Sequence, residues 1–157
     1  MDNVAEKGAN IDCKDYQKQT VLHRAAKEGN HEIVDIILDH LIGAKEDQTD
    51  GHIPALMKEE DTDGNTPLML AVLSGTSEAI KIFIEKGNSG HYIKKRNNEI
   101  EYPLHLACRS GDMKTAEVLV EHGADINVLN RYNESPLFLA AENTKDSTDL
   151  VVYLVEK

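Results

Sequence analysis

The residues able to do acid–base or metal chemistry in this chain are seven histidines and a large set of carboxylates. The carboxylates at 59–63 do not place alternating oxygen ligands and a closing glutamate in the register of a calcium loop. Five histidines are scattered without a His-x-x-x-His or His-Glu-x-x-His spacing, which would put two ligands on one helix face. They are His31, His40, His52, His91 and His122. These spacings predict no metal site.

Motifs for nucleophilic catalysis and for phosphate binding are also missing from the sequence. It has neither a Gly-x-Ser-x-Gly turn nor a Gly-x-x-x-x-Gly-Lys loop. Cys13 and Cys108 show no Cys-x-x-Cys spacing and have no paired histidines nearby, so we expect two reduced thiols without a chemical role. We predict no catalytic residue and no cofactor, and therefore a protein that is not an enzyme.

Charge and composition narrow the class of partner. Twenty-eight acidic and 17 basic residues give a formal charge of −11, so the surface repels nucleic-acid phosphates and anionic lipids. Aromatic residues make up 4% of the chain, too few for base-stacking platforms. No apolar run reaches the roughly 18–20 residues of a membrane span, and no signal peptide opens the chain. We expect a protein partner, no nucleic acid, no membrane insertion by this segment, and a cytoplasmic location.

One sequence element occurs four times in phase. Its first residue is of helix-capping type in three copies, proline suits the first helical position, and alanine lets neighbouring helices approach closely. A glycine nine residues after the start, absent from the fourth copy, suits a left-handed helix end. The copies read Thr20-Val-Leu-His-Arg-Ala-Ala, Thr66-Pro-Leu-Met-Leu-Ala-Val, Tyr102-Pro-Leu-His-Leu-Ala-Cys and Ser135-Pro-Leu-Phe-Leu-Ala-Ala. Each copy predicts a helix of about two turns.

A second helix is predicted after each of these, because apolar residues recur at helical spacing. These residues lie within 33–38, 80–84, 116–120 and 150–154. Gly-Ala-Asp-Ile-Asn at 123–127, echoed by Gly-Ala-Asn-Ile-Asp at 8–12, then predicts a turn into a short extended arm. The repeated unit is therefore helix, turn, helix and hairpin arm.

This unit resembles the ankyrin repeat family through its T-P-L-H-x-A element, its G-x-x-E-like turn and its G-A-D-I-N hairpin, over nearly the whole chain. The resemblance implies an all-α ankyrin repeat solenoid with hairpin arms, and it implies that His23 and His105 link the capping residue to neighbouring backbone. Both ends look cut from a longer array, so uncapped ends favour self-association. The expected units are 1–19 (tail of a preceding repeat), 20–65, 66–101, 102–134 and 135–157 (incomplete).

The unit lengths depart from the family period in two places. The four copies are spaced by 46, 36 and 33 residues, and only the last spacing equals the family period. About two extra residues lengthen the second helix of the first unit or its end, and an insert follows at 44–60. Within it, Pro54–Lys58 predicts one or two helical turns with Ile53, Leu56 and Met57 as an apolar face. The insert is either a partner-docking element or, as we favour, a solvated loop that tucks these residues onto the solenoid.

Partners of ankyrin repeats usually lie across the hairpin tips and the exposed face of the first helices. Tyrosine and arginine most often anchor interfaces, and three of the five tyrosines are predicted at these tips. The dense basic cluster at 94–96 is either a binding determinant or a solvated tip. The expected partner-binding residues are Tyr16, Lys18, Arg24, Tyr92, Lys94, Lys95, Arg96, Arg109, Arg131 and Tyr132.

Two finer expectations follow from the resemblance. Asn127, with Leu119 eight positions earlier, matches an ankyrin asparagine hydroxylation site; the alternative is an asparagine whose side chain bonds the turn backbone. The long insert, followed by an irregular Lys-Lys-Arg hairpin, resembles the cytosolic ankyrin array of transient receptor potential channels of the ankyrin subfamily. That resemblance implies a sensing and assembly element of a cation channel. The competing interpretation is the targeting arm of an enzyme, such as a kinase or a bacterial effector.

Overall fold

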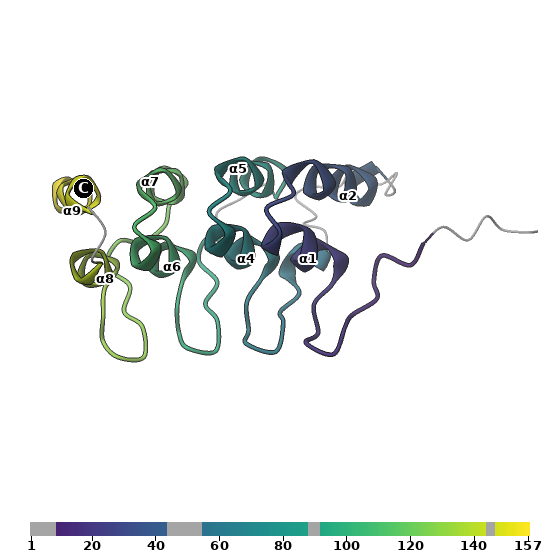
Figure 1. Cartoon of the computed structure of the whole chain (residues 1–157), viewed down its shortest axis with the longest axis horizontal. Helices are drawn as coiled ribbons and strands as arrows, with labels where there is room; N and C mark the ends of the chain where they lie inside the picture. Colours follow the sequence, from purple (N-terminus) through teal and green to yellow (C-terminus); the bar gives the residue numbers. More distant parts are fainter. Residues whose placement is uncertain (1–8, 44–54, 88–91, 144–146) are drawn as a thin grey trace, which may run out of the picture.

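The computed structural model describes residues 9–43, 55–87, 92–143 and 147–157. Within these ranges the chain is helical and contains no strand, and eight helices stand in two parallel rows (Figure 1). The row of first helices holds α1 (Val21–Lys27), α4 (Pro67–Ser74), α6 (Pro103–Ser110) and α8 (Pro136–Glu142). The row of second helices holds α2 (His31–Gly43), α5 (Ser77–Lys86), α7 (Met113–Glu121) and α9 (Thr148–Glu156). The predicted all-α solenoid with hairpin arms is confirmed.

The ends of the first helices follow from the repeated sequence element. The Thr66 hydroxyl accepts a hydrogen bond from the N–H of Met69 at 3.4 Å, and the Ser135 hydroxyl accepts one from the N–H of Phe138 at 3.2 Å. Gly75 ends α4 with a φ of 70°, in the left-handed region that a residue without Cβ adopts freely. The chain then reverses into the second helix.

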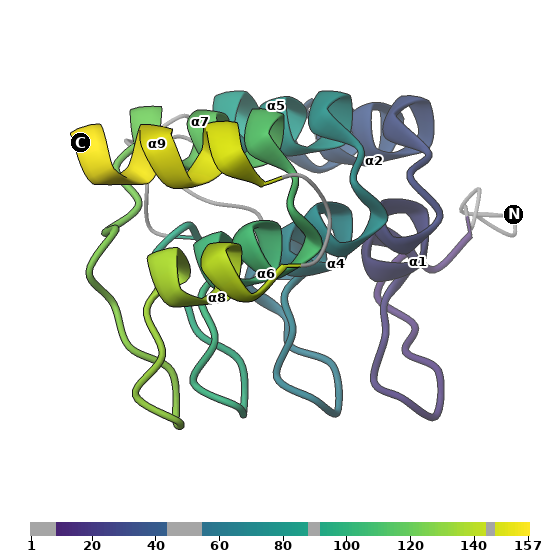
Figure 2. The same cartoon turned by 60° about the vertical axis from the view of Figure 1, so that its left-hand side comes forward.

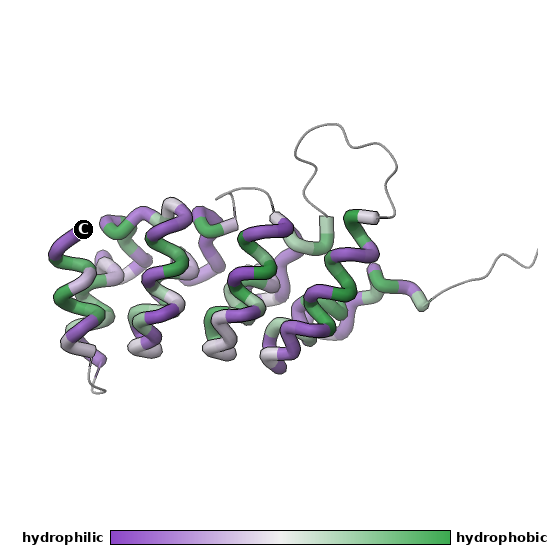
Figure 3. Tube along the Cα trace, turned by 90° about the horizontal axis from the view of Figure 1, so that it is seen from above, coloured by the Kyte–Doolittle hydropathy of each residue, from purple (hydrophilic) through white to green (hydrophobic). Residues whose placement is uncertain are grey.

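Within each unit the two helices pack against each other, and each helix also packs against its counterpart in the next unit. Thus α1 packs against α2 and α4, and α2 packs against α5, as the two rows in Figure 2 show. Hydrophilic and hydrophobic positions alternate around the helices in Figure 3, as expected for helices with one buried face. The alanines of the repeated element, Ala25, Ala71, Ala107 and Ala140, are at most 7% exposed, which permits this close approach.

The described part of the insert packs onto the solenoid. The short helix α3 (Ala55–Lys58) lies against α4, with Leu56 and Met57 buried, as the favoured interpretation of the insert predicts. The extra residues of the first unit lengthen α2, which has 13 residues against 10 in α5. Three predicted segments lie outside the described residues. They are the start of the preceding repeat's tail at 1–8, the insert at 44–54 with Ile53 and Pro54, and the middle of the loop at 144–146, where the fourth copy lacks the turn glycine.

Candidate functional site: the hairpin face

An aspartate or asparagine side chain folds each hairpin tip. The Asp61 carboxylate accepts hydrogen bonds from the N–H groups of Asp63 at 3.0 Å and Asn65 at 2.8 Å, so one oxygen closes the turn. The same pair of bonds, to the residues two and four positions later, recurs at the other three tips, whose first residues are Asp15, Asn97 and Asn130. The sequence carries this signal, an acid or amide five residues before each helix cap, but none of the predictions from sequence used it.

Backbone hydrogen bonds join the tips into a ladder. The N–H of Thr62 donates to the carbonyl oxygen of Gln17 at 2.9 Å, and the N–H of Asn98 donates to that of Asp63 at 3.0 Å. The N–H of Arg131 donates to the carbonyl oxygen of Glu99 at 3.4 Å. The tips are therefore held in fixed relative positions, so the side chains that they expose form one continuous surface.

In each tip, the residue three positions after the aspartate or asparagine that closes the turn has a positive φ. Gly64 adopts 79° without strain, and a Cβ there would lie 2.6 Å from Oδ1 of Asn98 in the next hairpin. Asn133 also tolerates its value of 61°, whereas Ile100 adopts the same angle with a β-branched side chain, which is unfavourable. The third tip therefore stores local backbone strain.

Two buried histidines fix the hairpins to the first helices. Nδ1 of His23 accepts a hydrogen bond from the N–H of Thr20 at 3.2 Å, so Nε2 carries the proton and donates to the carbonyl oxygen of Asn65 at 3.1 Å. His105 donates in the same way to the carbonyl oxygen of Glu134 at 3.1 Å. Burial lowers the pKa of both rings, against the raising effect of these backbone bonds. Both imidazoles are neutral structural links, as the resemblance implied.

Ion pairs connect neighbouring arms at residues that come just before the tips in the chain. Lys14 pairs with Glu59 at 2.5 Å, and Glu60 pairs with Lys95 at 2.7 Å. All four side chains are more than one-third exposed, so each pair stabilises the fold by about 0–1 kcal/mol. Lys95 therefore has a partner inside the array, which makes it a weaker candidate for binding another protein.

Two further predicted binding residues also have partners within the array. Arg131 pairs with Glu99 at 2.9 Å and donates to the carbonyl oxygen of Asn98 at 2.9 Å, which reinforces the ladder. Arg109 forms an ion pair with Glu101, whose side chain is almost buried. These guanidinium groups are partly exposed, but they already stabilise the hairpins.

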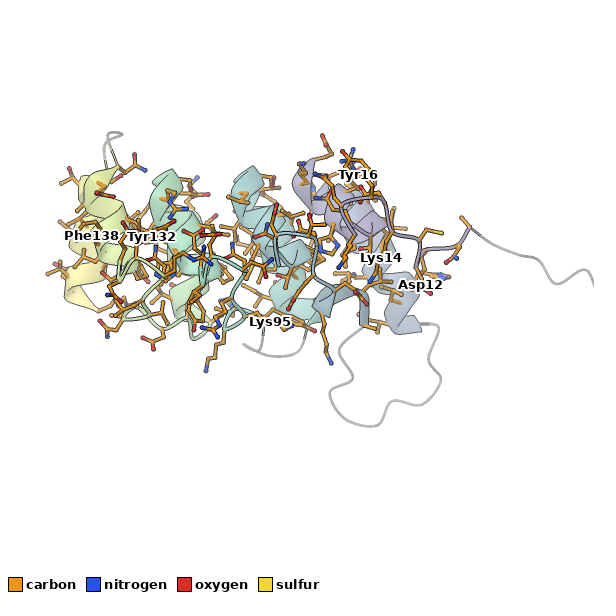
Figure 4. The ribbon with its side chains drawn as sticks, turned by 90° about the horizontal axis from the view of Figure 1, so that it is seen from below. Asp12, Lys14, Tyr16, Lys95, Tyr132 and Phe138 are labelled. Carbon is orange, nitrogen blue, oxygen red and sulfur yellow. The ribbon has the colours of Figure 1, made fainter. Side chains whose placement is uncertain are left out.

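The remaining predicted residues are exposed, with one exception. Tyr16 is 90% exposed and Tyr132 is 67% exposed, and Figure 4 shows them toward opposite ends of the hairpin side. Lys18 and Arg24 are exposed as well. The prediction of Tyr92 at an exposed tip is wrong, because this side chain is only 3% exposed.

Tyr92 is buried and lies near Met57, a residue of the insert. A Cβ on Gly87 would lie 2.6 Å from Cε2 of Tyr92 and 2.9 Å from Cε of Met57, so all three residues meet at the end of α5. Burial also raises the pKa of the Tyr92 hydroxyl above its ordinary value. Met57 belongs to the insert of the first unit, and Tyr92 belongs to the unit that is three residues longer than the family period. The two segments that depart from the repeat length thus meet at Gly87.

The basic cluster at 94–96 is also displaced from its predicted place. The tip turn is closed by the N–H of Ile100, which donates to the carbonyl oxygen of Asn97 at 3.0 Å, so the cluster precedes the tip and lies on the arm. Lys94 and Arg96 are exposed, whereas Lys95 is half-buried beside Glu60. The cluster therefore presents two cations to a partner rather than three.

The rest of the described chain offers no competing chemical site. Within the described ranges no group of three or more histidine, cysteine or acidic residues is placed to hold a metal ion. Burial raises the pKa of the Cys108 thiol to about 12, which keeps it protonated, and Cys13 is exposed. Among these same residues, no helix is long and apolar enough to cross a bilayer.

Comparison with known proteins identifies the repeat. A family model described as "Ankyrin repeats (3 copies)" matches residues 2–92, 51–127 and 89–157. Alpha-latrotoxin-Lh1a of Latrodectus hasselti is 34% identical over 124 residues, 79% of this chain and 8% of the toxin. Ankyrin repeat and SOCS box protein 11 of Danio rerio is 28% identical over 123 residues, which are 78% of this chain and 36% of that protein.

A third relative is a cation channel. Transient receptor potential cation channel subfamily A member 1 of Homo sapiens is 28% identical over 149 residues, 89% of this chain and 12% of the channel. The chain thus spans a small part of each of these relatives, from 8% to 36% of their lengths.

Proposed function

Because the chain belongs to the ankyrin repeat family, whose repeats are in general protein-interaction modules, we propose that it binds a protein partner through its hairpin face. The hairpin face comprises the four tips, the arms that lead into them and the exposed side of the first helices. Its candidate contact residues are Tyr16, Lys18, Arg24, Lys94, Arg96 and Tyr132. Tyr92 leaves the predicted set because its side chain is buried. Lys95, Arg109 and Arg131 leave it because they pair with Glu60, Glu101 and Glu99.

The observation that carries the proposal is the exposure of large tyrosines on a fixed backbone. Tyr16 and Tyr132 are 90% and 67% exposed, while the backbone bonds of the tip ladder hold the segments that carry them. An aromatic side chain with two rotatable bonds loses little conformational entropy on binding, and it buries a large area. Tyrosine is accordingly among the residues that dominate interface energies.

The charge of the same face supports a role in recognition. Lys94 and Arg96 are exposed and form no ion pair within the described part of the chain, although the whole chain carries a formal charge of −11. A local positive region on an acidic protein favours the approach of an acidic segment of a partner.

A second candidate function depends on which longer protein, here called the parent, contains these repeats. The match to a transient receptor potential cation channel covers 89% of this chain, which favours a cytoplasmic array of such a channel as the parent. The module would then serve in assembly and sensing. A targeting arm of an enzyme, such as a kinase or a bacterial effector, is the competing parent, and the full-length sequence distinguishes the two.

The proposal is tested by comparing the proteins that immobilised variants retain from a cell lysate. The Tyr16→Ser/Tyr132→Ser double variant removes the exposed tyrosines. The control, Ile36→Ser/Val152→Ser, removes two exposed apolar residues of the second helices, 67% and 49% exposed. A partner of the hairpin face should be retained by the wild type and the control, and depleted about tenfold on the tyrosine variant. Equal retention of every protein by all three rejects the proposal.

A further inference from the structure

A pocket of about 300 Å³ opens between the arm that leads into α6 and the arm that leaves α7. Ile93, Leu104 and Val128 form apolar walls, and Ile93 and Leu104 are themselves almost completely buried. Lys94 and Asp125 bring a cation and an anion to its lining. This volume is at the lower end for ligand pockets, so it suits one aromatic group rather than a larger ligand.

The corresponding place one unit earlier is filled by an aromatic ring. Met57 and Gly87 hold the positions in their unit that Ile93 and Gly123 hold in the next one. A Cβ on Gly87 would lie 2.6 Å from Cε2 of Tyr92 and 2.9 Å from Cε of Met57. The tyrosine ring therefore closes the space beside this glycine.

The third unit has no residue that does the same. The segment from Gly87 to Ile93 is three residues longer than the one from Gly123 to Ile126, and the longer segment supplies Tyr92. The backbone also turns differently, with φ values of −79° at Gly87 and 93° at Gly123. A Cβ on Gly123 would meet no atom within 4 Å. The space beside Gly87 is thus closed by a tyrosine of the chain itself, whereas the corresponding space beside Gly123 is open.

We propose that the open pocket receives a tyrosine side chain of the partner protein. The inference rests on the proposed function and adds an anchoring site to the hairpin face. The apolar walls replace the environment that Met57 gives to Tyr92, so the ring is buried on binding. The phenol hydroxyl both donates and accepts, and Asp125 and Lys94 supply the matching acceptor and donor.

The pocket is tested first with p-cresol, which is the tyrosine side chain as a free molecule. Titration into the ¹⁵N-labelled chain should shift backbone amide signals of Ile93, Lys94, Leu104 and the 123–128 segment, with weak affinity of about 1 mM. The Val128→Phe variant fills the pocket and should abolish these shifts. The control Val152→Phe adds the same ring at an exposed position of α9 and should keep them.

Two results overturn the proposal at this stage. One is a wild-type titration without shifts at the pocket residues, and the other is a set of shifts unchanged in the pocket-filled variant. Should Val128→Phe fail to fold, Ala124→Leu fills the same pocket from another wall and provides the same comparison. The wild-type titration alone also decides whether the pocket accepts a phenol.

A displayed random-peptide library then tests whether the ring comes from a protein. Peptides selected on the wild-type chain should be enriched in tyrosine, and their affinity should fall at least tenfold on the Val128→Phe variant. Selected peptides without aromatic residues, or with equal affinity for both chains, reject the pocket. Peptides that depend on Tyr16 and Tyr132 but not on the pocket leave the proposed function intact.

Discussion

Nε2 of His23 donates a hydrogen bond to the carbonyl oxygen of Asn65 over 3.1 Å, which joins the first helix of one unit to the hairpin of the next. Nδ1 of the same ring accepts from the N–H of Thr20. A second proton on the ring would therefore place an N–H donor against the N–H of Thr20. His105 makes the equivalent link two interfaces later, between the third and fourth units. Both rings are fully buried, and both networks require a neutral imidazole.

We expect the free energy of unfolding to fall as the pH drops below about 6.5, the ordinary pKa of histidine. Burial lowers the folded-state pKa of His23 and His105, so the unfolded chain binds these protons first. The stability from neutral rings is complete above the unfolded pKa and is lost as the pH falls toward and through the folded pKa. Urea unfolding at about pH 7.5 and about pH 5.5 measures this loss. Both pH values lie above the ordinary pKa range of carboxylates, so few of these groups titrate between them.

Single substitutions assign the pH dependence to these rings. His23→Gln should cost about 1–3 kcal/mol at neutral pH, because it disturbs a buried hydrogen-bonded group, and it should reduce the loss between the two pH values. The control His40→Gln changes an exposed histidine of α2 and should leave that loss unchanged. A His23→Gln chain with the wild-type pH dependence would contradict the assignment.

The strain at the third hairpin tip predicts a stabilising substitution. Ile100 has a φ of 61°, a conformation that costs a residue with a branched Cβ roughly 1–2 kcal/mol, whereas Asn133 has the same φ in the next tip. Ile100→Asn should raise the free energy of unfolding by about 1 kcal/mol, measured by urea denaturation.

The matched change at the second tip has the opposite sign. Gly64→Ala adds a Cβ at a φ of 79°, 2.6 Å from Oδ1 and 2.8 Å from the backbone nitrogen of Asn98. It should destabilise the chain by more than about 1 kcal/mol, because both the backbone and the neighbouring hairpin resist it. If Ile100→Asn destabilises the chain as well, packing of the isoleucine outweighs its backbone strain.

These two tips mark where prediction from sequence ends. Glycine and asparagine are the residue types that favour a positive φ, so this conformation can be predicted at Gly64 and Asn133. No feature of the sequence near Ile100 indicates a positive φ there. The caps, glycine turns and buried histidines were predicted because each depends on residues within one unit or on a motif. Tyr92 was placed wrongly because its burial depends on Met57, from another insertion 35 residues earlier.

The two exposed cations before the third tip, Lys94 and Arg96, should influence the rate of association with a partner. With a partner identified through the tyrosine variant, Lys94→Glu/Arg96→Glu should slow association several-fold and weaken its salt dependence, because long-range attraction to an acidic segment is lost. The control Lys81→Glu/Lys114→Glu makes the same charge change at exposed positions of the second helices. Equal association rates for both variants, measured by stopped flow, would show that net charge rather than location matters.

The ends of the array expose positions that the middle buries. Phe138 of the last unit is 50% exposed, although His105, its counterpart one unit earlier, is fully buried. Ile33 of the first unit is 43% exposed, although its counterpart Ala79 is fully buried. We expect weak self-association through these faces, visible as a concentration-dependent sedimentation coefficient.

Polar substitutions at these positions separate self-association from stability. Phe138→Ser/Ile33→Ser should abolish the concentration dependence while changing the free energy of unfolding by less than about 1 kcal/mol, since both side chains are already half in solvent. A consensus ankyrin repeat fused after Lys157 should instead raise the unfolding midpoint by covering Phe138. A strictly monomeric wild type whose midpoint the fusion leaves unchanged would contradict this account of the ends.

Asn127 remains the candidate for asparagine hydroxylation. Its side chain is exposed and makes no hydrogen bond within the described part of the chain, whereas its backbone N–H donates to Asp125 at 2.8 Å. Among the described residues, the Asn127 side chain therefore does not bond the turn backbone, which was the alternative interpretation of this asparagine. We expect mass spectrometry of protein from animal cells to find one added oxygen on the peptide that contains Asn127, and none in Asn127→Ala.

The extent of that modification should depend on how easily α7 unwinds. Leu119, eight residues before Asn127, is completely buried, so the segment becomes extended in a hydroxylase only after the end of α7 opens. Asp112 caps α7 by accepting a hydrogen bond from the N–H of Thr115 at 3.1 Å, and Asp112→Ala should weaken the helix by about 1 kcal/mol. The open population, and with it the hydroxylated fraction at limiting enzyme, should then rise about fivefold. An unchanged or lower fraction, with a known substrate modified in the same cells, would mean that opening of α7 does not control access to Asn127.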